Sequence, residues 1–208
     1  MTSPPRAVVF DFGGVLVTWE PHVVWQRLLG DDQDVDAFLA EIGFEQWNHS
    51  LDAGGDWDEA VAEAVERFPH HRDVLLAYRE AYVDTITGLI DGSVALLREL
   101  VAARVPVYGL TNWSAEGMRR AQDTLTFLPL LEGYVVSGDE RIAKPDPRLW
   151  RLLTERFGLT PIETVYIDDR EDNIAVATEL GFRTVHFTGP EALRRALRDL
   201  GLPVATHG

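Results

Sequence analysis

Short apolar runs alternate with amphipathic segments along most of the chain. Five short apolar runs have the length of a strand, at residues 7–10, 105–110, 134–136, 164–167 and 184–187. A continuous apolar run is typical of a strand that is covered on both faces, as in a parallel sheet. Because helical periodicity separates most of the runs, the pattern predicts right-handed crossovers and a doubly wound α/β sheet of Rossmann type.

Capping signals mark several of the predicted helices. Asp146 before Pro147 predicts a helix start, since proline is favoured at the first helical position. Ser93 is expected to cap the helix that follows it. Thr160 and Glu163 have the spacing of a capping box, which predicts one more short helical turn.

One interval breaks the alternation of strands and helices. Residues 19 to about 90 are far more than a single crossover requires, and they show amphipathic helices without a convincing strand. The clearest of these helices begins at Asp56, with Glu59 at the third helical position. We therefore predict an α/β core of residues 1–18 and 88–208, with a helical subdomain over residues 19–87 inserted after the first strand.

Composition narrows the class of protein. The 208 residues are 46% apolar and 25% charged, as in an ordinary globular protein. The formal net charge of -15 disfavours binding to nucleic acid or to an anionic membrane. The absence of cysteine excludes disulfides, thiolate metal sites and cysteine catalysis. No apolar segment is long enough for a signal peptide or a membrane span, so a cytoplasmic enzyme is expected.

Polar side chains follow four of the five predicted strands. In doubly wound sheets, ligands bind at the carboxyl ends of the strands, so these residues are expected to meet at one edge. They are Asp11, then Thr111 with Asn112, then Lys144, and finally Asp168 and Asp169 with Asn173. Taken singly, each is more often a cap or a surface residue, but four such motifs in succession favour a catalytic site.

The gathered residue types suit phosphoryl transfer. Several carboxylates in one place stay ionised only if a cation compensates them, and oxygen ligands favour a hard ion such as Mg²⁺. A carboxylate such as Asp11 can attack phosphorus and form an aspartyl-phosphate. Thr111 can donate to phosphate oxygens, and Lys144 can supply positive charge to the transition state. Gly13 and Gly14 let the backbone turn tightly beside a bound phosphate.

These motifs together resemble those of the haloacid dehalogenase superfamily. The resemblance rests on the run from Asp11 to Leu16, Leu110-Thr111-Asn112, Lys144-Pro145-Asp146, and Asp168-Asp169 with Asn173. It extends over essentially the whole chain. The helical insertion is similar to the α-helical cap of the first type in that superfamily. The resemblance implies a magnesium-dependent phosphatase that acts on a small phosphorylated molecule.

The resemblance also implies a role for each residue. Asp11 is the expected nucleophile, Thr111 holds the phosphoryl group with Asn112 beside it, and Lys144 orients Asp11. The expected metal site joins Asp11 and the backbone carbonyl of Gly13 to Asp169 as main ligand, with Asp168 as second ligand or orienter. Gly14 and Asn173 are expected to support the site.

One position departs from the pattern of phosphatases in this superfamily. They usually carry a second aspartate two residues after the nucleophile, which protonates the leaving group, and here that position is Gly13. General acid catalysis typically supplies ~10²–10⁴-fold in rate. We expect either substrates with good leaving groups, such as anomeric sugar, acyl or aryl phosphates, or a substitute acid. The candidates in the inserted segment are His22, Glu45, His49 and Asp52.

Two alternative functions follow from the same residue. Dehalogenases of 2-halo acids also lack the second aspartate, but they would leave the adjacent Asp168 and Asp169 uncompensated beside Asp11. A catalytically weak or dead binding protein would also tolerate Gly13. A dead site, however, has no chemical need for Asp11, Thr111, Lys144 and Asp169 together.

Overall fold

The computed structural model describes residues 4–206, so the outermost positions of the predicted core, 1–3 and 207–208, lie outside the described residues. A parallel sheet of five strands forms the centre, in the order β5-β4-β1-β6-β7. Its strands are β1 (Ala7–Phe10), β4 (Val107–Thr111), β5 (Gly133–Val136), β6 (Thr164–Asp168) and β7 (Arg183–His186). This architecture confirms the predicted doubly wound α/β sheet.

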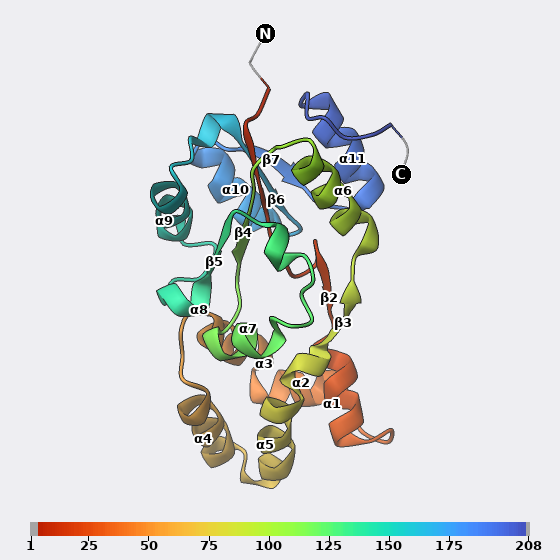
Figure 1. Cartoon of the computed structure of the whole chain (residues 1–208). Helices are drawn as coiled ribbons and strands as arrows, with labels where there is room; N and C mark the ends of the chain where they lie inside the picture. The colour runs from red at the N-terminus through yellow and green to blue at the C-terminus, as the bar shows by residue number, and fades with distance from the viewer. Residues whose placement is uncertain (1–3, 207–208) are drawn as a thin grey trace.

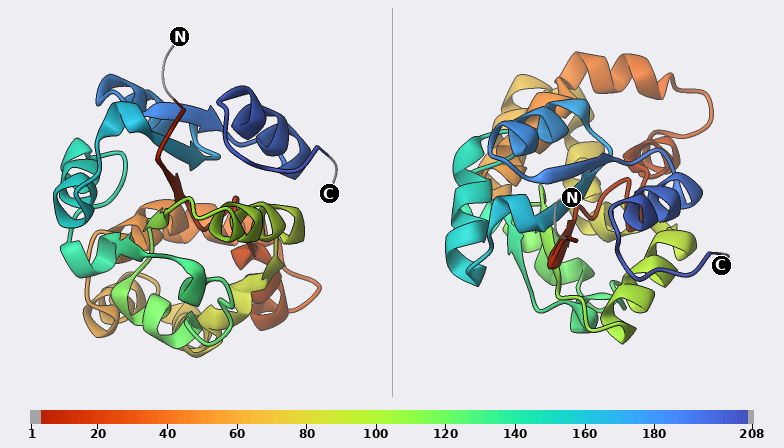
Figure 2. Two further views of the ribbon diagram at one scale, coloured as in Figure 1. Left: turned by 45° about the horizontal axis from the view of Figure 1, so that its top comes forward. Right: turned by 90° about the horizontal axis from the view of Figure 1, so that it is seen from above.

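Helices cover both faces of the sheet, which explains why its strands are apolar on both sides (Figures 1 and 2). Val8 and Phe10 of β1 pack with α6 (Asp91–Ala102) and α11 (Pro190–Asp199). Val9 packs on the opposite face, against α9 (Pro147–Phe157) and α10 (Glu171–Glu179). The alternation of successive side chains therefore buries every residue of β1.

A helical insertion, defined here as residues 21–85, separates β1 from the rest of the core. It contains α1 (Pro21–Leu29), α2 (Val35–Ile42), α3 (Phe44–Asp52), α4 (Trp57–Arg67), η1 (Pro69–His71), α5 (Arg72–Ala81) and η2 (Tyr82–Thr85). In Figure 1 these helices lie together below the sheet, beside α7 (Ala115–Ala121) and α8 (Ser137–Glu140).

A two-stranded antiparallel ribbon joins the helical insertion to the core. It pairs β2 (Val17–Trp19) with β3 (Ile86–Leu89). The expectation that residues 19 to about 90 contain no strand was therefore wrong. Neither strand is a continuous buried run, because Trp19, Thr87 and Gly88 are exposed. Their partners also lie far apart in the sequence, so local patterning did not indicate the pair.

Aromatic rings form the centre of the helical insertion. Trp25 of α1 stacks on Tyr78 of α5, with ring centroids 3.9 Å apart and planes inclined by 8°. Phe44, Trp47 and Trp57 surround the same tyrosine. Such aromatic pairs add to the stabilisation from burial alone. The insertion therefore has an apolar centre that continues into the core of the sheet domain.

Polar contacts hold the helical insertion against α7 of the core. The indole Nε1 of Trp57 donates to Ser114 Oγ at 3.1 Å. The guanidinium of Arg79 donates to both carboxylate oxygens of Glu116, at 3.1 and 2.9 Å. Arg120 returns a hydrogen bond to the backbone oxygen of Arg79 at 2.6 Å. Together these contacts fix the position of the helical insertion relative to α7.

The capping predictions had mixed outcomes. Asp56 and Asp146 both accept backbone hydrogen bonds at the starts of α4 and α9, as expected. Ser93 does not cap α6, because that helix begins two residues earlier and Ser93 is buried inside it. Thr160 makes no side-chain cap to the turn η4 (Pro161–Glu163). Another short turn, η3 (Leu128–Leu130), precedes β5.

Candidate active site

The predicted site residues meet at the carboxyl edge of the sheet, where the core faces the helical insertion. Asp11 follows β1, Thr111 ends β4 and Asp168 ends β6. A cavity of about 1220 Å³ lies between the edge and the insertion. Its lining includes Asp11, Gly13, Gly14, Asn112, Lys144, Asp169 and Asn173 from the core. Thr111 and Asp168 are buried immediately behind this lining.

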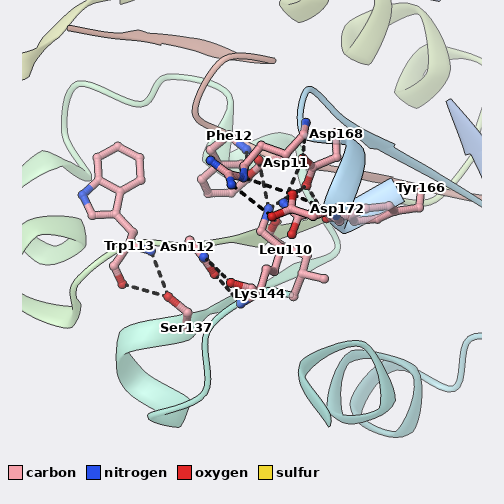
Figure 3. Close-up of polar contacts among 12 residues, drawn as sticks. Asp11, Phe12, Leu110, Asn112, Trp113, Ser137, Lys144, Tyr166, Asp168 and Asp172 are labelled. Carbon is pink, nitrogen blue, oxygen red and sulfur yellow. Dashed lines mark hydrogen bonds and ion pairs between the residues drawn. The ribbon is translucent and has the colours of Figure 1, made fainter. Parts of the chain in front are cut away.

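Lys144, the single lysine of the chain, is the electrostatic centre of the site (Figure 3). Its Nζ lies 2.9 Å from Asp11 Oδ2 and 2.8 Å from Asp168 Oδ2, and it donates to the carbonyl of Leu110 at 3.2 Å. These three partners match the three hydrogens of an ammonium group. Because Lys144 is only 2% exposed, it holds Asp11 in place rather than moving in solvent.

Asn112 fixes the loop that carries Lys144. Its Oδ1 accepts from the Lys144 backbone N–H at 2.7 Å, and its Nδ2 donates to the Lys144 carbonyl at 3.0 Å. Both polar atoms of the Asn112 amide are thus hydrogen-bonded to the backbone of Lys144. The resemblance implied a place for Asn112 beside the phosphoryl group, and the side chain instead points its polar atoms at the backbone of Lys144 (Figure 3).

Asp168 is fully buried and its oxygens are hydrogen-bonded on all sides. Besides Lys144, it accepts from the Tyr166 hydroxyl, from Asn173 Nδ2 at 3.0 Å and from the Arg170 backbone N–H at 2.9 Å. Sequence reasoning missed Tyr166. The available signal was its spacing, since residues two apart in a strand share a face of the sheet. Asp169 differs, since it is partly exposed and borders the cavity.

The site carries more negative charge than its lysine balances. When all three carboxylates, those of Asp11, Asp168 and Asp169, are ionised, the one ammonium leaves an excess of two negative charges. Burial raises the pKa of Asp11 to about 8, although Lys144 lowers it. Burial and the charge of Asp168 raise the pKa of Asp169. Burial also disfavours ionised Asp168, but Lys144 and the hydrogen bonds outweigh it and lower that pKa.

This arrangement fits a divalent cation. Oxygens of Asp11, Asp168 and Asp169 lie within 4.8 Å of one another, and a charge of +2 would compensate the excess. A set of oxygen ligands without imidazole or sulfur is the kind that Mg²⁺ prefers. Because the hydrogen bonds of Asp168 occupy its oxygens, Asp11 and Asp169 are the better placed ligands. A second cluster, Glu41 with His70 and His71, lies on the helical insertion and has the nitrogen ligands of transition metals.

Gly13 and Gly14, which follow Asp11, differ in whether the backbone there could carry a larger residue. Gly14 has a φ of +73°, and a Cβ there would lie 2.3 Å from Asp169 Oδ2. Only glycine fits that close approach between the two loops. No atom lies within 4 Å of the corresponding point at Gly13, and its φ is not in the left-handed region. The expectation that both glycines serve a tight turn therefore applies to Gly14 alone.

Comparisons with known proteins show the family of this chain. The family model for haloacid dehalogenase-like hydrolases matches residues 5–181, and the chain belongs to this family of enzymes. It is 26% identical over 203 residues to a sesquiterpene phosphatase of Aspergillus oryzae, covering 96% of this chain and 98% of the relative. It is 27% identical over 205 residues to (S)-2-haloacid dehalogenase 4A of Burkholderia cepacia, covering 89% and 84%.

The fold also matches solved structures. A haloacid dehalogenase family enzyme from Bacteroides thetaiotaomicron, solved as a magnesium complex, superposes with a TM-score of 0.68 at 21% identity. The match covers 90% of this chain and 95% of that chain. Within residues 4–206, no helix has the length and apolar character to cross a bilayer.

Proposed function

We propose that this hydrolase is a magnesium-dependent phosphatase that cleaves a small-molecule phosphate monoester through an aspartyl-phosphate at Asp11. The observation that carries the proposal is the excess of two negative charges around Asp11 and Asp169 beside a buried Lys144. A 2-halo acid substrate would add a further negative charge to that site. In a phosphatase, a bound cation can offset the negative charge of the carboxylates.

Each residue contributes one action in the proposed mechanism. An Asp11 carboxylate oxygen attacks phosphorus, and Lys144 holds that carboxylate and balances charge on the phosphoryl oxygens. Thr111 holds the phosphoryl group from the end of β4, while Asn112 fixes the Lys144 loop. Asp168 orients Lys144 and is itself oriented by Asn173.

The proposed ligands of Mg²⁺ are Asp11, the Gly13 carbonyl and Asp169, with Asp168 in the second layer. When bound, the ion would screen the repulsion between the attacking carboxylate and the phosphoryl group. A magnesium complex is known for the solved relative of Bacteroides thetaiotaomicron, which supports the choice of metal.

The substrate class follows from the cavity and the relatives. We propose that residues 19–87 form a cap over the core and that the cavity between them admits a phosphorylated small molecule, for example a sugar phosphate. The phosphatase from Aspergillus oryzae, which aligns along nearly its whole length, supports a small-molecule substrate. We also propose a cytoplasmic location for the enzyme.

Dehalogenation is the second candidate, because Gly13 and the relative from Burkholderia cepacia are compatible with it. Halide release from 2-halo acids needs no general acid and no metal. Turnover of a 2-halo acid in the presence of chelator would support dehalogenation and contradict the phosphatase.

The direct test is release of inorganic phosphate from p-nitrophenyl phosphate and a panel of sugar phosphates, with Mg²⁺ or with chelator. Asp11→Asn serves as the inactive control. The proposal predicts turnover by wild type only with Mg²⁺. Silence of wild-type protein on every phosphate with Mg²⁺ would refute it.

A further inference from the structure

The proposed phosphatase lacks an acid at Gly13, so another group must protonate a poor leaving group. Besides the hydroxyl of Tyr82, five titratable side chains of the helical insertion line the cavity: His22, Asp36, Glu45, His49 and Asp52. Four of these five are exposed to solvent, whereas Asp52 is only 8% exposed. A carboxyl held out of water at the wall of a reaction cavity is the environment in which an acid stays protonated near neutral pH.

Asp52 and Asp11 line the same cavity. It is the last residue of α3, which lies against α8 and beside α7 at the edge of the sheet (Figure 1). The charge of Lys144, which contacts Asp11, also acts on the carboxyl of Asp52. The insertion therefore supplies a carboxyl to the cavity that Asp11 and Lys144 also line.

Asn48 can form a hydrogen bond with Asp52 whether the carboxyl is ionised or protonated. Its Nδ2 donates to Asp52 Oδ2 at 3.0 Å, which suits the ionised form. Its Oδ1 is buried and has no hydrogen-bond partner among the described residues. A side-chain amide turned over about its final bond exchanges donor for acceptor, so Asn48 can equally accept from the protonated carboxyl.

We propose that Asp52 is the general acid and base of this enzyme, in place of the aspartate that is missing at Gly13. The inference rests on the proposed phosphatase function. In the first step Asp11 bonds to phosphorus, the bond from phosphorus to the leaving oxygen breaks, and that oxygen takes the proton of Asp52. In the second step Asp52 takes a proton from water, whose oxygen bonds to phosphorus while Asp11 leaves. The products are the free alcohol and inorganic phosphate, with Asp52 protonated again.

The surroundings of Asp52 are consistent with a proton that both binds and leaves. Burial raises the pKa of Asp52 to about 7, while the Ser114 backbone N–H and the charge of Lys144 lower it. The other titratable groups that face it are the hydroxyls of Tyr78 and Tyr82, whose pKa values are raised by burial and by Asp52 itself. Both tyrosines are therefore neutral near pH 7, and Lys144 is the cation that acts on Asp52.

A series of aryl phosphates tests the proposal. Poor leaving groups need a proton, and good ones leave without it. Asp52→Asn is expected to lose ~10²–10⁴-fold in kcat on phenyl phosphate but only a few-fold on 2,4-dinitrophenyl phosphate. Its rate should therefore depend steeply on leaving-group acidity, while wild type shows a shallow dependence. Retained turnover of the dinitrophenyl ester shows that the variant is folded and that Asp11 still works.

Two further variants sharpen the test. Asp73→Asn removes an exposed carboxylate from α5, away from the cavity, and should keep the shallow dependence of wild type. Gly13→Asp introduced into Asp52→Asn should restore turnover of phenyl phosphate, because Gly13 has room for a side chain. An unchanged dependence in Asp52→Asn, with wild type active, would overturn the role of Asp52 and leave the phosphatase standing. An inactive wild type would instead overturn the phosphatase itself.

Discussion

Gly14 and Asp169 meet so closely that a single methyl group on Gly14 would overlap the Asp169 carboxylate. Gly14→Ala is therefore expected to displace Asp169, to lower stability by about 1–3 kcal/mol through its positive φ and to weaken Mg²⁺ binding. Thermal melts with and without Mg²⁺ measure both effects. Gly13→Ala is the matched control for stability, since its Cβ would meet no atom within 4 Å. Equal melting temperatures for the two variants would contradict this account.

Asp11→Asn should abolish phosphate release while leaving the protein folded. The amide is a poor nucleophile, so a loss of roughly 10³-fold or more is expected. Its oxygen can still accept from Lys144, and it removes a carboxylate whose ionisation burial disfavours. The melting temperature without metal should therefore equal or exceed that of wild type. A large loss of stability would instead indicate that Asp11 is a structural residue.

Lys144→Met should damage both stability and catalysis. It leaves Asp11 and Asp168 without the ammonium that they share, and removing one partner of a buried ion pair costs about 3–5 kcal/mol. Urea unfolding measures the change. Arg148→Met is the control, because its ion pair with Asp146 has an arginine that is 65% exposed and should contribute about 0–1 kcal/mol. Comparable losses in the two variants would contradict the central place of Lys144.

The raised pKa of Asp52 predicts that the free energy of unfolding depends on pH. Because its pKa is raised from 3.8 to about 7 in the folded state, the folded protein binds this proton more tightly than the unfolded chain does. The contribution is present at low pH and is lost as the pH rises through 7, with an upper bound of about 4 kcal/mol. Asp52→Asn should therefore gain melting temperature relative to wild type between pH 5 and 8.5. A constant difference across that range would contradict the raised pKa.

The inner strands β1 and β6 and the residues at their ends were predictable from the sequence, because both strands are buried on both faces and Asp11 and Asp168 lie at their carboxyl ends. What was not predictable depends on contacts between distant segments. The bonds from Asn112 to the backbone of Lys144 leave no local pattern. Asp52 was one of four equal candidates, and only its burial at the end of α3 separates it from the other three.

A proline shifts the start of β4 from the position that the apolar run suggested. The apolar run suggested a strand from residue 105, but the strand begins at Val107. Pro106 has no N–H to offer the ladder, although its carbonyl accepts from Val8 at 3.0 Å. The strand also ends one residue later than the apolar run, at Thr111, which pairs in register with Val136 of β5.

The ribbon of β2 and β3 places the entrance and the exit of the helical insertion side by side. Its two strands are hydrogen-bonded to each other and belong to a sheet of their own. An insert of any size can therefore be exchanged at this point without altering the register of β1 against β4 and β6. The core can therefore keep the proposed chemistry at Asp11 while the inserted module is exchanged. In this chain that module also carries Asp52, so exchanging it would exchange part of the catalytic apparatus along with the specificity.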